Sequence, residues 1–175
     1  NPLFGQETNR QDFERWCSVL QGRWIGDVTY VTDWTSFGKK GDKVTAYFQA
    51  RPSLDGNGMI TSFLGGKGSE RGMFYYDAAA KRTRGTFVSS GGTLIQLTNW
   101  PDGEGWKEVF HVTLPDGTKG RVEGQLVLSE NGKKLTIRRN GQIGDEVIKN
   151  EMDVWRRVSP VSHKRKAPSA TSRGT

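Results

Sequence analysis

The sequence predicts an all-β protein: an antiparallel meander closed into a barrel of eight to ten strands, with one short helix near its N-terminal end. Glycine-containing turns recur about every ten residues, and the segments between them are rich in β-forming residues. The chain holds 23 Gly together with eight Phe, six Trp and four Tyr, which suits β-structure better than helices. An open meander of this length would expose two long strand edges, so we expect closure.

Helical spacing occurs once, over residues 9–20, where Phe13, Trp16, Cys17 and Leu20 fall on one face. Turns are expected at LDGNG, GGKG, DAAAK, SSGG, PDGEG, PDGT, ENG and NGQIGD. The strands between them are expected to begin at Arg23, Val44, Met59, Gly72, Arg82, Thr93, Trp106, Arg121, Lys133 and Glu146.

The position of the charge separates a domain from a tail. The length of 175 residues indicates one domain, which we assign to residues 1–158. Residues 159–175 contain Lys164, Arg165, Lys166 and Arg173 without an acidic residue, and their composition predicts a disordered basic tail. Of the net charge of +7, +3 belongs to the domain. We therefore expect no specific nucleic-acid partner; the tail either aids solubility or contacts polyanions weakly.

Few residues are available for metal, redox or cofactor chemistry. Cys17 is the single cysteine, and His111 is the single histidine outside the tail, so we expect neither a disulfide nor a metal site. Nucleotide and hydrolase fingerprints are missing, and no cofactor is expected. Without a transmembrane or signal pattern, we expect a soluble monomer or homodimer, either cytoplasmic or exported with its signal removed.

One segment predicts how the barrel is closed. In LQGRWIG, a large ring at Trp24 shares a strand face with Gly22 and Gly26. A helix followed by Gly-x-Trp resembles the lipocalins and their calycin relatives, in which the tryptophan caps the closed end and an arginine of the last strand stacks over it. The resemblance implies closure by Gly22 and Trp24 with Arg156 of DVWRRV, the neighbouring Arg157 being the alternative.

A second resemblance covers most of residues 13–158. The segment GMFYYDAAAKRTRGTFVSSGGT (72–93), together with LQGRWIG and VWRRV, resembles an uncharacterised family of bacterial lipocalin-like domains. That family has no established reaction, so the resemblance implies the fold and leaves the function open. A barrel of eight to ten strands can be wide enough to hold a small ligand.

Alternation along the strands predicts which side chains line such a cavity. Inward-facing sets are expected to include Trp24 and Val28, Val44 and Ala46, Met59 and Thr61, Val122 and Leu128, and Ile148 and Val154. The candidate ligand-binding residues are Tyr30, Phe48, Phe63, Tyr75, Leu126, Arg139 and Met152. Arg139 shares a face with Leu135 and Ile137, so it either reaches the mouth and solvent or meets an anionic ligand group inside.

His111 has two possible orientations. It faces solvent if Phe110 and Val112 point inward, and it lines the cavity if Val109 does.

Three functional hypotheses follow. The first is binding of a small, largely apolar molecule, with or without a carboxylate, inside the barrel. The second is a cofactor-independent cyclase, isomerase or lyase assisted by His111, Tyr30 and Arg139. The third is a protein- or polyanion-interaction module that uses the outer surface and the tail.

Overall fold

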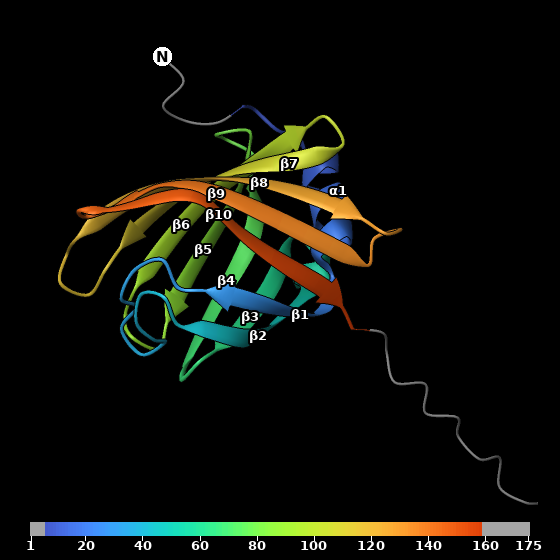
Figure 1. The fold of residues 1–175 in the computed structure, drawn as a ribbon. Coiled ribbons are helices and arrows are strands. Elements are labelled where there is room, and N and C mark those ends of the chain that lie inside the picture. Colours follow the sequence, from blue (N-terminus) through green and yellow to red (C-terminus); the bar gives the residue numbers. More distant parts are fainter. Residues whose placement is uncertain (1–5, 159–175) are drawn as a thin grey trace, which may run out of the picture.

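The computed structural model describes residues 6–158 and confirms the closed antiparallel meander (Figure 1). Each strand pairs with the next along the chain, and β1 pairs with β10 to close the ring. The elements are α1 (Arg10–Leu20), β1 (Gly22–Thr29), β2 (Lys43–Ser53), the 3₁₀ turn η1 (Leu54–Gly56), β3 (Gly58–Gly65), β4 (Gly68–Asp77), β5 (Arg82–Ser89), β6 (Leu94–Asp102), β7 (Gly105–Thr113), β8 (Lys119–Ser129), β9 (Lys134–Ile143) and β10 (Glu146–Arg157).

The predicted turns set the strand boundaries closely everywhere except at β4. This strand begins at Gly68 rather than at Gly72. Its first residues, Ser69, Glu70 and Arg71, are polar and read as a loop, yet they pair in register with β3. The difference matters because it makes Glu70 part of a barrel strand, from which its side chain reaches the lumen.

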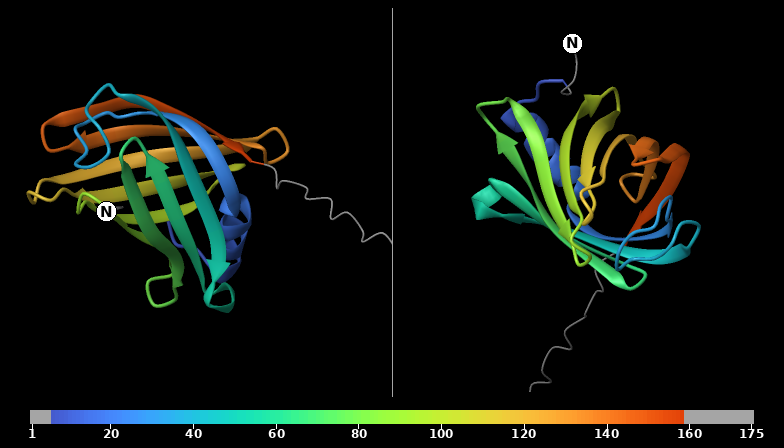
Figure 2. Two further views of the ribbon diagram at one scale, coloured as in Figure 1. Left: turned by 90° about the horizontal axis from the view of Figure 1, so that it is seen from below. Right: turned by 90° about the vertical axis from the view of Figure 1, so that its left-hand side faces the viewer.

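Helix α1 lies across one end of the barrel, as the view along the strands shows (Figure 2, right). It begins after Asn9, whose side chain accepts a hydrogen bond from the backbone N–H of Asp12, while the Asp12 carboxylate accepts one from the N–H of Asn9. Its buried face consists of Phe13, Trp16 and Leu20. Trp16 packs against the ring of Trp106 at 5.0 Å between centroids, so the helix forms the floor of the barrel.

Residues 30–42, between β1 and β2, fold over the lumen at the other end. The loop is fixed by hydrogen bonds from the N–H of Tyr30 to the carbonyl of Asp42 and from the N–H of Lys67 to the carbonyl of Phe37. Phe37 packs on Phe63 at 5.7 Å. Gly68 leaves room for the Phe37 ring, because a Cβ at this position would lie 2.5 Å from it.

The predicted basic tail, 159–175, lies outside the described residues. No helix within residues 6–158 combines the length and apolar character needed to cross a membrane.

Candidate ligand-binding site

A cavity of about 260 Å³ lies between α1 and the 30–42 loop. Its wall is built mainly from aromatic and aliphatic side chains that alternate along the strands. Rings contribute from several sides, including Phe48, Phe63, Phe74, Phe87, Phe110 and Trp155. A dry apolar cavity of about 150 Å³ is large enough for benzene, so this one has room for a somewhat larger molecule.

Most of the predicted lining residues contribute to this wall. Tyr30, Phe48, Phe63, Leu126 and Arg139 all line the cavity. Gly26 faces the same interior, where a Cβ would lie 2.6 Å from the ring of Trp155. The glycine of the first strand therefore makes room for a tryptophan of the last.

Two predicted lining residues lie elsewhere, and these assignments are wrong. Tyr75 follows Phe74, which lines the cavity, so alternation turns Tyr75 to the outer face of β4. Met152 is half exposed on the outer face of β10. Val154 lies two residues after Met152 and therefore faces outward as well. Of the three residues expected to face inward on this strand, only Ile148 does so.

A β-bulge explains the error on β10. The register with β9 shifts between Ile148 and Glu151. Asn150 has a left-handed backbone (φ 51°), and its N–H donates to the Asn140 side chain at 2.9 Å. An extra residue reverses the alternation beyond it. Asp153 and Glu151 consequently face the lumen, where Met152 was expected.

A polar row crosses the cavity wall over four adjacent strands. Cross-strand register aligns Glu108 on β7, Gly124 on β8, Arg139 on β9 and Glu151 on β10. The Glu108 side chain lies over Gly124, because a Cβ there would be 2.6 Å from Glu108 Oε1. The missing side chain at Gly124 allows the carboxylate and the guanidinium on its two sides to approach each other.

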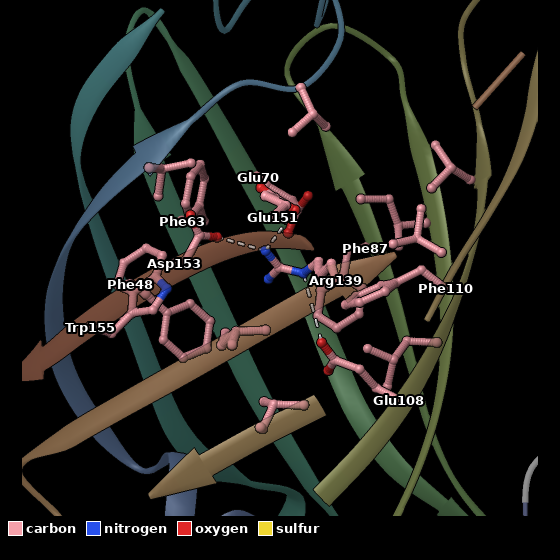
Figure 3. A pocket seen from close by; sticks show the side chains of 18 of the residues that line it. Phe48, Phe63, Glu70, Phe87, Glu108, Phe110, Arg139, Glu151, Asp153 and Trp155 are labelled. Carbon is pink, nitrogen blue, oxygen red and sulfur yellow. Dashed lines mark hydrogen bonds and ion pairs between the residues drawn. The ribbon is translucent and has the colours of Figure 1, made fainter. Parts of the chain in front are cut away.

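Arg139 lies at the centre of the charged groups (Figure 3). Its Nη1 donates to Asp153 Oδ2 at 2.6 Å and lies 3.6 Å from Glu151 Oε2, while its Nε lies 3.9 Å from Glu108 Oε1. The guanidinium also lies 5.7 Å from the centre of the Phe110 ring. Arg139 thus faces the interior, but the chain's own carboxylates already pair with it.

Burial alters the protonation of this cluster. Desolvation raises the pKa of Glu108 to about 7, and it raises that of Glu70, which reaches the cavity from β4, to about 7 as well; in both cases Arg139 opposes the shift. Desolvation also raises the pKa of Glu151. Burial disfavours the charged form of Arg139, but Asp153, Glu151 and Glu108 outweigh it and raise its pKa. The arginine remains charged, while Glu70 and Glu108 titrate near neutral pH.

His111 lies on the exposed face of β7, because Phe110 and Val112 point inward. This corresponds to the first of its two predicted orientations, and it removes His111 from the cavity.

At the closed end, Arg157 rather than Arg156 covers Trp24. The Arg157 guanidinium lies 4.1 Å from the centre of the Trp24 ring and donates to the carbonyls of Gly132, Gln21 and Val19. Trp24 Nε1 donates to the Leu20 carbonyl at 2.9 Å. The assignment to Arg156 is wrong because this residue points outward, where it pairs with Glu130. Gly22 has a φ of 123° and leaves space for Arg157.

Sequence reasoning missed the four acidic groups of the wall. Glu108 alternates with Trp106 and Phe110, which is a detectable signal of a carboxylate on an apolar face. Glu70 was hidden in an expected loop, and the bulge hid Glu151 and Asp153. Within residues 6–158, no group of three or more His, Cys, Asp or Glu side chains has an arrangement that could hold a metal ion.

Neither a protein-family model nor a curated protein sequence matches the chain.

Proposed function

We propose that this protein is a lipocalin-like binding protein that holds a small, largely apolar molecule inside the barrel. The observation that carries the proposal is the 260 Å³ cavity, lined mainly by aromatic and aliphatic side chains, with polar groups gathered on one part of its wall. Ligand sites combine these features: an apolar wall supplies affinity, and a few polar groups orient the ligand. The helix-covered end and the Trp24–Arg157 stack support the lipocalin-like relationship.

The size of the cavity favours one ring or a short chain as the ligand. A suitable neutral probe is 3-phenylpropan-1-ol, which adds a short arm and a hydroxyl to a benzene ring. Transfer of its apolar surface from water drives binding at about 25 cal/mol per Å². Calorimetric titration should give a saturable signal with a negative heat-capacity change.

A matched pair of substitutions on β8 tests whether the probe enters the barrel. Leu126→Phe introduces a phenyl ring inside the cavity. Val127→Phe introduces the same ring at a half-exposed position on the outer face. We expect Leu126→Phe to weaken binding at least about tenfold. Val127→Phe should leave binding unchanged. Thermal melting of both variants verifies folding. Lack of probe binding by the parent, or equal weakening by both substitutions, would refute the proposal.

A second candidate is an enzyme acting on the same class of molecule. It is favoured by Glu108, a buried carboxyl group with a pKa of about 7 in an apolar cavity, which suits a proton donor or acceptor at neutral pH. In this hypothesis Glu108 has the proton-transfer role that the sequence suggested for His111.

Native mass spectrometry of co-purifying molecules separates the two candidates. A carrier should retain the same molecule in the parent and in Glu108→Gln. An enzyme should retain its unconverted substrate in the variant. Chromatography of the released molecule distinguishes substrate from product even where, as in an isomerisation, the two have the same mass.

A further inference from the structure

The charges that face the cavity are unevenly matched. Among the described residues of the wall, Arg139 is the one cation, and it faces four acidic groups: Glu70, Glu108, Glu151 and Asp153. These groups come from β4, β7 and β10, so the acidic surface reaches the lumen from several sides. One guanidinium cannot neutralise all four of these groups when they are ionised.

Arg139 also leaves particular oxygen atoms without a hydrogen bond. Asp153 Oδ1 and Glu108 Oε1 are buried and accept no hydrogen bond in the described part of the chain, and Tyr30 Oη on the same cavity wall has no partner either. Asp153 and Glu108 are 3% and 4% exposed. The 3.9 Å between Glu108 Oε1 and Arg139 Nε is too long for a hydrogen bond. Buried acceptors of this kind are costly unless a donor reaches them.

The chemistry of the missing partner follows from these atoms. A primary ammonium group supplies three N–H donors and one positive charge. It can donate to carboxylate oxygens, and the surrounding rings, Phe63, Phe87 and Trp155 among them, attract a cation through their faces. A carboxylate supplies no donor and would meet like charges. An alcohol offers one donor without the charge.

We infer that the ligand of this barrel is a small amine, with an aromatic or short aliphatic body, whose ammonium group is received by Glu108 and Asp153. This inference rests on the proposed function and specifies the ligand class of the same cavity. Arg139 acts as a positioning residue, since it holds Asp153 in place and limits the repulsion among the acids. Glu70 and Glu151 add to the negative potential around the ammonium group.

Binding should be coupled to proton release. Glu70 and Glu108 have a pKa of about 7, and that of Glu151 is also raised. A bound cation favours their ionised forms and lowers these pKa values. Tyr30, whose pKa burial raises, remains neutral, and Arg139 remains charged. Amine affinity should therefore increase from pH 6 to pH 8, where an alkylamine is still protonated.

The test uses three probes with the same body: 3-phenylpropylamine, 3-phenylpropan-1-ol and 3-phenylpropanoate, titrated calorimetrically into the full chain. At pH 8 we expect the amine to bind at least about tenfold more tightly than the alcohol, and the carboxylate to bind most weakly. Amine affinity should fall at pH 6 while alcohol affinity stays constant. Titration in buffers of different ionisation enthalpy should detect released protons.

Substitution of Glu108 locates the effect. Glu108→Gln should reduce amine affinity about tenfold and change alcohol affinity less than about twofold. The matched control is Glu123→Gln, which removes an exposed carboxylate from the outer face of β8 and should alter neither. Alcohol binding by the Glu108→Gln variant verifies that its cavity is intact.

The outcomes distinguish a failure of this inference from a failure of the proposed function. If the alcohol binds and the amine binds no more tightly, the barrel holds apolar molecules but the inference is wrong. If the carboxylate binds most tightly, Arg139 receives the ligand and the inference is also wrong. If none of the probes binds, the proposed function fails together with the inference.

Discussion

The barrel contains two arginine clusters that are completed in different ways. At the closed end, Arg157 stacks on Trp24 and donates to three backbone carbonyls, so neutral acceptors of the chain satisfy it. In the cavity, Arg139 is surrounded by carboxylates, and oxygens of Glu108 and Asp153 remain without donors. The first cluster is complete without any other molecule, whereas the second has acceptors to spare.

This difference distinguishes a structural plug from a candidate binding site better than residue type does. Both arginines lie near aromatic rings, Arg139 on β9 and Arg157 at the end of β10. The plug should contribute mainly to stability, and its substitution should have little pH dependence. The cavity cluster should make stability depend on pH, because its carboxylates are buried at some cost.

The largest effect is expected at the plug. Trp24→Ala should lower the free energy of unfolding by roughly 3 to 5 kcal/mol, since Trp24 is almost fully buried beneath α1 and Arg157. In a domain of this size, that loss corresponds to a melting temperature lower by about 10 °C. A melting temperature within one degree of the parent would show that Trp24 does not close the barrel.

The next effect concerns the cavity, where burial favours the neutral form of a carboxyl group over its charged form. The raised pKa of Glu108 means that the folded state binds a proton more tightly than the unfolded chain does, so its contribution is present below about pH 4.5 and is lost as pH rises through about 7. Glu108→Gln should reduce the fall in unfolding free energy between pH 5 and pH 8 by about 2 kcal/mol.

Denaturant unfolding at several pH values measures this slope. The exposed control Glu123→Gln should follow the parent curve. An unchanged slope in Glu108→Gln would mean that Glu108 is ionised across the range, and the contrast between the two clusters would then disappear.

The smallest effect tests which of the two neighbouring arginines, Arg156 or Arg157, closes the barrel. Arg157→Leu should destabilise by about 1 to 2 kcal/mol, from the lost stack on Trp24 and the carbonyls left without a donor. Arg156→Leu removes an exposed ion pair with Glu130 and should change stability by less than about 0.5 kcal/mol. Equal losses would assign closure to neither arginine.

Local signals in the sequence were sufficient for the architecture. Recurrent turns gave the order of the strands, and the spacing of Phe13, Trp16 and Leu20 gave the helix. Alternation also placed Phe48, Phe63 and Arg139 on the cavity side. These features depend on neighbours in the chain, so one sequence contains the information needed to predict them.

The charged site depends on contacts between distant strands and was not predicted. Glu70, Glu108 and Asp153 lie far apart in the chain and face one cavity only after the barrel closes. One extra residue near Asn150 reverses the faces of β10, and strict alternation cannot anticipate it. Asn adopts the left-handed backbone conformation more readily than most residues, so Asn150 was the available signal.

The seam between the first and last strands also determines when the interior can form. It runs from Trp24↔Arg157 to Asp27↔Val154, and Arg157 reaches a carbonyl 136 positions away at Gln21. Contacts of such long range slow the folding of a chain, because a long loop must be closed before they form. Until β10 docks, Glu108 and Arg139 remain in contact with water, which keeps both groups hydrated. We therefore expect the cost of enclosing their charges to fall on the step of folding in which the first and last strands meet.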